Sequence, residues 1–390
     1  MNLKSTVLIS IFIIGFVEVF CQEMTNQFSS ETDTLLIKTN RIKGFGGFNF
    51  GGGFLEFQDT TNLFNYPINL PKPLTNVLGI RIPVDFKSEL DYIDIIKGQL
   101  PSEKVVMIVD QNNNHSFMDE TSFSLQPIDW YSSENSIPVT FLVSNGVETG
   151  QHQSWIRIGS WNSDIIYGRD EYLSASIFID DKNFEVGIID QPLSGSFTYG
   201  LNPEIALLSS ELGKKDSIKV NDLIKKGEYL QLNDFYFKFD SINNNGSILR
   251  LVKENSFDTK TGIQVGMLAP EFEFKSTAGD IVNTSNLHDK PIIIANSCAC
   301  GGDTKSSQAY FEIREIYQTN AYVLRLDSFS ENQQDNWTIN MEDEFNKDSD
   351  IMYRREYCST ICYVIGQNQR ILDKFMITDW QTNLPDLLKN

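Results

Sequence analysis

The sequence predicts a multidomain chain in which a β-rich N-terminal part, sandwich- or barrel-like, is followed by a C-terminal α/β domain. Between Thr32 and Phe257, short apolar runs recur with turn signals between them, which is typical of strands in sandwiches and barrels. From Gly262 onward, strand-like runs alternate with helix-length segments, which is typical of an α/β sheet with helices on both faces.

The first 21 residues predict an export signal. Lys4 gives a positive start, residues 7–16 form an apolar run, and Val19 and Cys21 suit positions −3 and −1 of a cleavage site before Gln22. The run is shorter than the roughly 20 residues that a membrane-spanning helix needs. We therefore expect a signal peptide over 1–21, a periplasmic or secreted mature protein, and no transmembrane segment after cleavage. An uncleaved membrane anchor, or an outer-membrane lipoprotein cleaved before Cys21, is the alternative.

The composition is that of a globular protein, with 41% hydrophobic and 12% aromatic residues. The formal net charge of −20 argues against nucleic acid and anionic membranes as partners, because both are polyanions. The three histidines share no metal-ligand spacing, and the nucleophile-elbow, Walker A and H-E-x-x-H patterns do not occur.

Apolar runs predict the strands of the β-rich part, which are Thr34–Thr39, Val105–Val109, Val139–Val143, Ser174–Ile179, Phe184–Ile189, Tyr229–Leu232, Phe235–Phe239 and Ile248–Val252. The Gly- and Phe-rich segment 44–57 reads either as short strands with a turn or as a loop with aromatic anchors. The turn Asn243–Gly246 is a strong hairpin signal, since Asn and Gly both tolerate positive φ. We expect one β-rich domain over 22–147 and a second over 148–260.

The last part, over 261–390, has a different order of elements. A strand at residues 292–295 precedes a turn with Cys298 and Cys300, and Tyr310, Ile313 and Tyr317 then recur at helical spacing. A strand at 321–326, a hairpin at 363–375 and a short helix at 383–388 follow. This order predicts a thioredoxin-like domain.

The opening segment of this domain carries a family resemblance. Residues 265–274 read Val-Gly-Met-Leu-Ala-Pro-Glu-Phe-Glu-Phe, followed by Ala278-Gly-Asp and Asn286-Leu-His-Asp-Lys-Pro. This pattern resembles the redoxin class, which contains the alkyl hydroperoxide reductase/thiol-specific antioxidant proteins and the exported thiol–disulfide oxidoreductases. The β-rich part looks like the extension that some bacterial exported redoxin proteins carry.

The resemblance implies a site for thiol–disulfide exchange. A cysteine at a helix N-terminus has a lowered pKa, because the helix dipole and unpaired N–H groups stabilise its thiolate. By resemblance, Cys298 is the nucleophile, Cys300 is the resolving thiol, and Cys362 flanks the groove as an alternative resolving cysteine. The substrate would be a disulfide of another exported protein or of a redox partner protein, and no cofactor is required.

The site departs from the family pattern in its cysteine spacing, in its proline loop and in its lead-in, where Ala295-Asn-Ser replaces the tryptophan-rich segment of the reductases. One residue rather than two separates Cys298 from Cys300, and such a small ring makes a disulfide easily reduced. Thr360-Ile361-Cys362 stands where the family has a proline loop. Ala295 stands where the peroxidase branch has threonine, so peroxidase chemistry fits less well.

Two other interpretations of the cysteines stay open. All four that follow the signal, namely Cys298, Cys300, Cys358 and Cys362, lie in the last hundred residues. They would serve as structural disulfides between two loops, or as a Cys₄ site for zinc or copper. Either reading makes the protein a non-catalytic periplasmic or surface binding protein.

One further loop offers oxygen ligands at alternate positions, as calcium loops do. These candidate ligands follow a predicted buried strand and are Asp110, Asn112, Asn114, Asp119 and Glu120. A solvated, Asn-rich turn is the alternative. The redox chemistry requires no cofactor, and calcium at this loop is the one bound ion that the sequence indicates.

Overall fold

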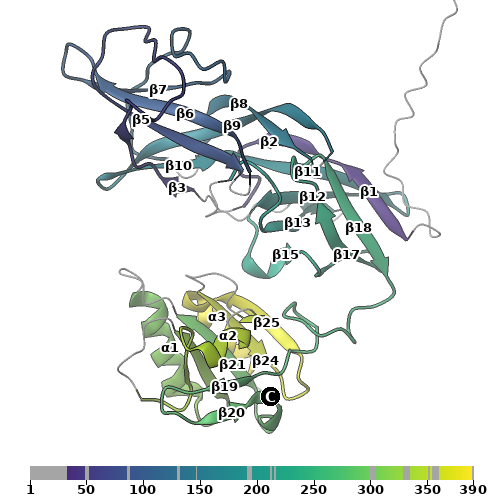
Figure 1. Cartoon of the computed structure of the whole chain (residues 1–390). Coiled ribbons are helices and arrows are strands. Elements are labelled where there is room, and N and C mark those ends of the chain that lie inside the picture. The colour runs from purple at the N-terminus through teal and green to yellow at the C-terminus, as the bar shows by residue number, and fades with distance from the viewer. Residues whose placement is uncertain are drawn as a thin grey trace, which may run out of the picture.

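The computed structural model describes residues 33–48, 52–85, 88–129, 132–145, 147–190, 196–210, 213–214, 217–297, 304–327, 334–349, 352–353 and 360–388. Within these residues the protein is β-rich with few helices (Figure 1). The expected signal peptide over 1–21 lies outside the described residues, as do Cys298, Cys300 and Cys358.

Two antiparallel sheets of the β-rich part share one apolar core. The first sheet has the order β1 (Thr34–Lys38), β18 (Ile248–Glu254), β17 (Phe235–Ile242), β16 (Tyr229–Leu232). The second sheet has the order β14 (Gly213–Lys214), β13 (Pro203–Ser210), β12 (Lys182–Asp190), β11 (Glu171–Ile179), β2 (Asn40–Lys43), and β15 (Ile224–Lys225) also pairs with β13. Alternate side chains such as Ile37, Ala175 and Phe239 are buried between the two sheets. The alternation of apolar and polar residues in these strands therefore lets each sheet bury one face against the other, in the β-rich part that the sequence predicts.

A second pair of sheets encloses another core. One sheet has the order β4 (Gln58–Asp59), β5 (Thr75–Asp85), β6 (Ser88–Gln99), β7 (Val105–Val109). The other has the order β3 (Gly53–Phe54), β10 (Asp164–Arg169), β9 (Thr149–Trp161), β8 (Ile137–Ser144). Ile95, Val109, Phe141 and Phe197 are buried where these sheets meet.

The strands do not separate at the boundary expected between residues 147 and 148. This point falls in the turn of the β8–β9 hairpin, which pairs from Ile137 with Ile156 to Ser144 with Thr149. In addition, β1 pairs with β18 and β2 pairs with β11, so strands from both expected domains share sheets. The expected boundary therefore does not coincide with a boundary between sheets.

The predicted Asn-Gly hairpin joins β17 to β18, and its glycine is required. Gly246 has φ +76°, and a Cβ atom at this position would lie 2.6 Å from Leu173 Cδ1. The turn therefore packs so closely against Leu173 of β11 that any side chain at position 246 would clash with it.

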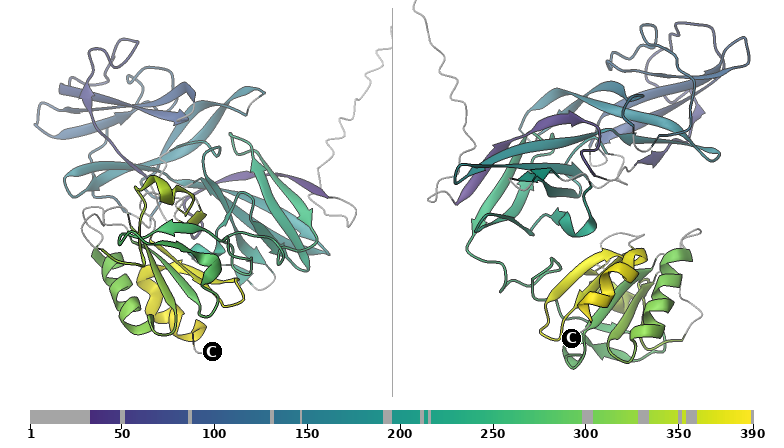
Figure 2. Two further views of the ribbon diagram at one scale, coloured as in Figure 1. Left: turned by 60° about the horizontal axis from the view of Figure 1, so that its bottom comes forward. Right: turned by 180° about the vertical axis from the view of Figure 1, so that it is seen from behind.

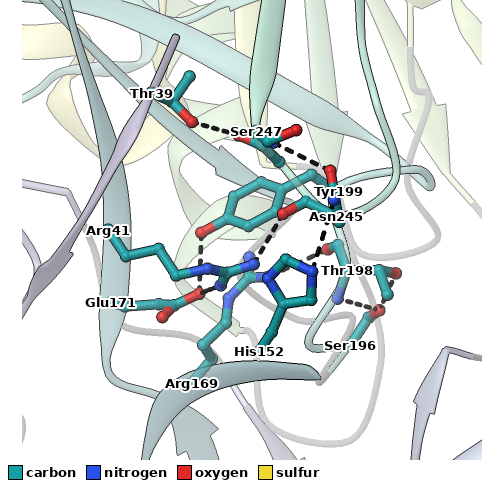
Figure 3. Close-up of polar contacts among 11 residues, drawn as sticks. Thr39, Arg41, His152, Arg169, Glu171, Ser196, Thr198, Tyr199, Asn245 and Ser247 are labelled. Carbon is teal, nitrogen blue, oxygen red and sulfur yellow. Dashed lines mark hydrogen bonds and ion pairs between the residues drawn. The ribbon is translucent and has the colours of Figure 1, made fainter. Parts of the chain in front are cut away.

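A buried polar cluster lies where this turn meets three sheets (Figure 3). The guanidinium of Arg41 pairs with Glu171, and the Tyr199 hydroxyl donates to Oε1 of the same carboxylate over 3.1 Å. Arg169 lies over the Tyr199 ring at 4.3 Å, and Asn245 lies 3.5 Å from the ring nitrogen of His152. The cluster thus joins β2, β9, β10, β11 and the β17–β18 turn. Burial raises the pKa of Tyr199, so it remains a neutral donor.

The C-terminal part is a five-stranded sheet with the order β23 (Thr338–Asn340), β22 (Tyr322–Asp327), β21 (Ile292–Ser297), β24 (Ile361–Ile365), β25 (Ile371–Met376). The first three strands are parallel, and β24 and β25 are antiparallel to their neighbours. Helices α1 (Thr304–Tyr317) and α3 (Trp380–Leu387) cover one face (Figure 2). The hairpin of β19 (Glu273–Lys275) and β20 (Ile281–Asn283), together with Tyr353, covers the other. This is the thioredoxin-like order that the sequence predicts.

Polar contacts connect the two parts of the chain at the edge strand β25. Lys374 Nζ lies 3.3 Å from the carbonyl oxygen of Leu223 and 4.0 Å from Glu228 Oε2. Gln264 exchanges two hydrogen bonds with the backbone of Tyr229, over 2.8 and 2.6 Å. The edge of the α/β sheet is therefore covered by the segment around η1 (Val220–Asp222).

Candidate active site

The two elements expected on either side of the Cys298–Cys300 turn are present. Strand β21 is buried at every position and ends at Ser297, and α1 begins at Thr304. Ala309, Tyr310 and Ile313 recur at helical spacing, and they bury α1 against the sheet. A helix N-terminus that follows a parallel strand presents N–H groups to whatever anion lies beside it.

A buried guanidinium lies between these two elements. Arg325 of β22 is 5% exposed, and its Nε donates to Ser297 Oγ over 2.7 Å. Its NH2 group donates to Ser307 Oγ over 3.0 Å and pairs with Asp327 Oδ2 at 2.7 Å. Ser297 is the residue before Cys298, and Ser307 lies in the first turn of α1. One side chain therefore contacts both ends of the segment that carries Cys298 and Cys300.

The opposite face of β21 holds a second bridging side chain. Asn296 is 1% exposed, and its Nδ2 donates to the carbonyl oxygens of Tyr353, over 3.2 Å, and Ile361, over 2.8 Å. These two residues stand on either side of Cys358 in the sequence. Asn296 therefore connects the start of β24 to the end of β21, two residues before Cys298.

Cys362 is a free thiol in the interior of the α/β sheet. It pairs with Ala295 across β24 and β21, and its side chain is fully buried with Ile293, Ala309 and Phe375. Burial raises the pKa of this thiol well above its ordinary value, and Asp373 adds to the effect. A thiolate at Cys362 is thus disfavoured, and a resolving role would require β24 to open.

The proposed calcium ligands are hydrogen-bonded to the loop itself. The Asp110 carboxylate accepts from the backbone N–H groups of Asn114 and His115, over 3.2 and 2.9 Å. Both oxygens of Glu120 accept from Gln111 at 2.8 Å. Asp119 Oδ2 accepts from the side-chain amides of Asn112 and Asn114, over 2.8 and 2.9 Å.

This arrangement corrects the calcium interpretation. The five candidate ligands Asp110, Asn112, Asn114, Asp119 and Glu120 all take part in a closed network of turn hydrogen bonds. In the part of the chain that the structure describes, no group of three or more His, Cys, Asp or Glu side chains could hold a metal ion. Calcium is therefore unsupported at this loop, and the Asn-rich turn is the better description.

Sequence reasoning missed Arg325 and Asn296. Arg325 lies inside the otherwise apolar run Ala321–Leu326. Asn296 directly follows the apolar run Ile292–Ala295, in the same strand. A charged or amide residue in a strand of a sheet covered on both faces must be paired, because its burial otherwise costs several kcal/mol. That mismatch was the available signal.

Solved structures that resemble this protein are thioredoxin-like domains matching about a third of the chain. The thioredoxin domain of a thiol-disulfide oxidoreductase from Bacteroides vulgatus covers 33% of this chain and 100% of its own, with 11% identity and a TM-score of 0.27. A thiol:disulfide interchange protein from Bacteroides sp. covers 34% of this chain and 93% of its own, with 10% identity and a TM-score of 0.28. An exposed lipoprotein thioredoxin from Streptococcus pneumoniae covers 30% of this chain and 100% of its own, with 16% identity and a TM-score of 0.24.

No protein-family model matches the chain, and no curated protein matches it either. Among the described residues, no helix is long and apolar enough to span a bilayer.

Proposed function

We propose that this protein is an exported thiol–disulfide oxidoreductase that acts on disulfides of other exported proteins through Cys298 and Cys300. The observation that carries the proposal is the set of elements on either side of the Cys298–Cys300 segment. A buried parallel strand ends at Ser297, a helix begins at Thr304, and the Arg325 guanidinium contacts both elements. A helix N-terminus and a nearby cation are the two features that favour a thiolate over a thiol.

The exchange proceeds in two substitutions at sulfur. The Cys298 thiolate attacks one sulfur of a substrate disulfide, forms a mixed disulfide, and releases the other substrate sulfur as a thiolate. The Cys300 thiolate then attacks Cys298 Sγ and releases the second substrate thiolate. The substrate gains two electrons and takes up two protons, while Cys298 and Cys300 become a disulfide. An exported dithiol protein would return this disulfide to the dithiol.

The state of Cys362 supports Cys300 as the resolving thiol. Cys362 is buried among apolar side chains, and its pKa is raised, so it is poorly suited to attack a mixed disulfide. The alternative scaffold, in which Cys298 and Cys300 are cross-linked to Cys358 and Cys362, would need a bond from this free thiol. A Cys₄ metal site would need it as a thiolate, which its burial opposes.

The direct test is insulin reduction by the mature chain, comparing the parent with Cys298→Ser. We expect the substitution to abolish turnover, and Ser285→Ala, in the same domain but away from the turn, to retain it. Turnover in Cys298→Ser equal to that of the parent would end the proposal.

Disulfide mapping by mass spectrometry, before and after mild reduction, provides a second measurement. A Cys298–Cys300 bond that opens under mild reductant supports exchange chemistry. Bonds from Cys298 or Cys300 to Cys358 or Cys362 that resist the same reductant would instead favour the non-catalytic binding protein.

A further inference from the structure

The sheet of β3, β10, β9 and β8 (Figure 1) carries a cavity along its edge. Strand β8 pairs with β9 as far as Ile137, which lies opposite Ile156. Further along β9, the backbone of Ser160 exchanges hydrogen bonds with the segment 126–128, over 2.9 and 3.0 Å. Between these two pairings a cavity of about 200 Å³ opens at Arg157. Since one water molecule occupies about 30 Å³ of the liquid, this cavity has room for a small organic molecule.

The cavity lining combines apolar side chains with uncharged polar ones. The first kind includes Phe123, Ile137 and Ile158, and the second includes Gln126, Ser132 and Asn135. A polar group that loses water without gaining a hydrogen bond is destabilising, so a wholly apolar ligand would leave this lining unsatisfied. The cavity therefore suits a ligand that offers both apolar surface and several hydrogen-bonding groups.

Arg157 is the one cation among the described residues that line the cavity, and its charge is already compensated. Its NH2 group pairs with Asp170 Oδ1 at 2.5 Å, and the two side chains are 3% and 0% exposed. Its NH1 group donates to the Asp129 carbonyl oxygen over 2.7 Å, and the ring of Phe45 lies 4.2 Å from the guanidinium carbon. An anionic ligand would find no uncompensated cation in this lining and would lie near the acidic Asp129, so the cavity favours an uncharged ligand.

Two exposed aromatic rings lie on the same face of the sheet as Arg157. Phe54 and Trp161 are 58% and 48% exposed, and their ring centroids are 6.4 Å apart with 31° between the planes. Arg157, Gly159 and Trp161 alternate along β9, so their side chains share one face. Phe54 lies on this face too, because β10 pairs one residue, Ile166, with both Phe54 and Gly159.

One wall of the cavity reaches this row of residues. A Cβ atom at Gly159 would lie 2.6 Å from the Cα atom of Ile128, which also lines the cavity. Gly159 precedes Trp161 by two residues on the same face. The cavity and the two aromatic rings are therefore neighbours on a single surface.

We propose that this face of the sheet binds an uncharged oligosaccharide, with one sugar unit in the cavity beside Arg157 and further units against Trp161 and Phe54. Four residues of β9 separate Arg157 from Trp161, which is about 14 Å, so the ligand is a short chain rather than a single sugar. A sugar ring presents an apolar C–H face that stacks on aromatic rings, and its hydroxyls both donate and accept hydrogen bonds. The inference goes beyond the proposed exchange reaction and uses none of its cysteines.

The test begins with binding of the mature protein to an array of neutral and anionic glycans. The neutral set comprises oligosaccharides of α- and β-glucans, xylans, mannans, galactans and chitin. Calorimetric titration with the tightest-bound oligosaccharide then compares the parent with Trp161→Ala, which removes an aromatic ring, and Asn135→Ala, which truncates the cavity lining. Phe178→Ala is the matched control, because Phe178 is an aromatic residue 44% exposed on β11, in a different sheet.

We expect a neutral glycan to bind, with an affinity about tenfold lower in Trp161→Ala and about threefold to tenfold lower in Asn135→Ala. Phe178→Ala should bind as the parent does. All three substitutions stand at exposed positions, so each variant should fold, and circular dichroism checks this.

Three results would overturn the inference. The first is an array on which no neutral glycan binds, and the second is a preference for anionic glycans. The third is an affinity that is unchanged in both Trp161→Ala and Asn135→Ala. If no glycan binds while the apolar dye bis-ANS binds the parent and not Trp161→Ala, the rings serve an apolar partner instead. Insulin reduction tests the exchange reaction separately, so either function can fail without the other.

Discussion

Cys362 lies directly opposite Ala295 in the antiparallel pair of β24 and β21. This register turns its sulfur into the apolar layer beneath α1 and away from solvent. We expect Cys362 to resist thiol reagents in the folded, reduced protein and to react only after unfolding. Peptide-level mass spectrometry with and without urea measures this. Labelling of native Cys362 at the rate of Cys298 would contradict this expectation and make Cys362 a candidate for the exchange reaction again.

Cys362→Ala should lower the free energy of unfolding by about 1 kcal/mol, because it leaves a small cavity.

The hydroxyl of Tyr199 supports the junction of three sheets. Tyr199→Phe removes its hydrogen bond to the Glu171 carboxylate. Because the acceptor is charged and buried, the free energy of unfolding should fall by about 1–3 kcal/mol. Tyr236→Phe, at a partly exposed position of β17, is the control and should change stability by less than about 0.5 kcal/mol. Urea unfolding measures the free energy of unfolding of both variants. Equal decreases would show that the Tyr199 hydroxyl contributes no more to stability than the partly exposed Tyr236 hydroxyl.

Lys374 and Glu228 form a buried contact between the β-rich part and the α/β sheet. Lys374→Met should lower the free energy of unfolding by about 1–3 kcal/mol, because it removes the positive charge beside the buried Glu228 carboxylate, which keeps its hydrogen bond from the Lys225 backbone N–H. Lys374→Met/Glu228→Gln removes both charges and should recover most of this loss. A double-mutant cycle in urea tests the expectation, and additive losses would show that the two residues do not interact.

Asp110 predicts a pH dependence of stability. Burial raises its pKa to about 6, although the N–H groups of His115 and Asn114 oppose the shift. The folded state therefore binds a proton more tightly than the unfolded state, so stability falls as pH rises from about 4 to about 6 and is constant above. Each pKa unit corresponds to about 1.4 kcal/mol.

Asp110→Asn should remove this dependence. The difference in the free energy of unfolding between parent and variant should move in favour of the variant between pH 4 and pH 6.5. A difference that stays constant over this range, or that moves in favour of the parent, would show that Asp110 ionises normally.

The order of elements follows from local sequence. Apolar runs predict β1, β7, the β11–β12 and β16–β18 meanders and β21, and a helical spacing of apolar residues predicts α1, because these patterns record which residues of each element are buried. The Asn-Gly turn is likewise a local property, since it depends on the φ angles of its own residues. The same patterns put Cys298 and Cys300, which define the candidate site, in the turn between a predicted strand and a predicted helix.

Long-range pairing was decided only in three dimensions. The β-rich part was expected as two successive domains, yet β1 pairs with β18 and β2 with β11, across most of that part of the chain. Nothing in a short window distinguishes one partner strand from another with the same alternation, because the choice depends on which faces can be buried together.

The candidate site divides in the same way. The sequence by itself determined that Cys298 and Cys300 stand between a buried strand and a helix. Only the tertiary structure decided that Cys362 faces the core, that the oxygens of the Asp110 loop bind its own N–H groups, and that Arg325 joins Ser297 to Ser307. The physical reason is that ionisation and hydrogen bonding depend on burial and on neighbours distant in sequence, which the packing of the sheet brings together.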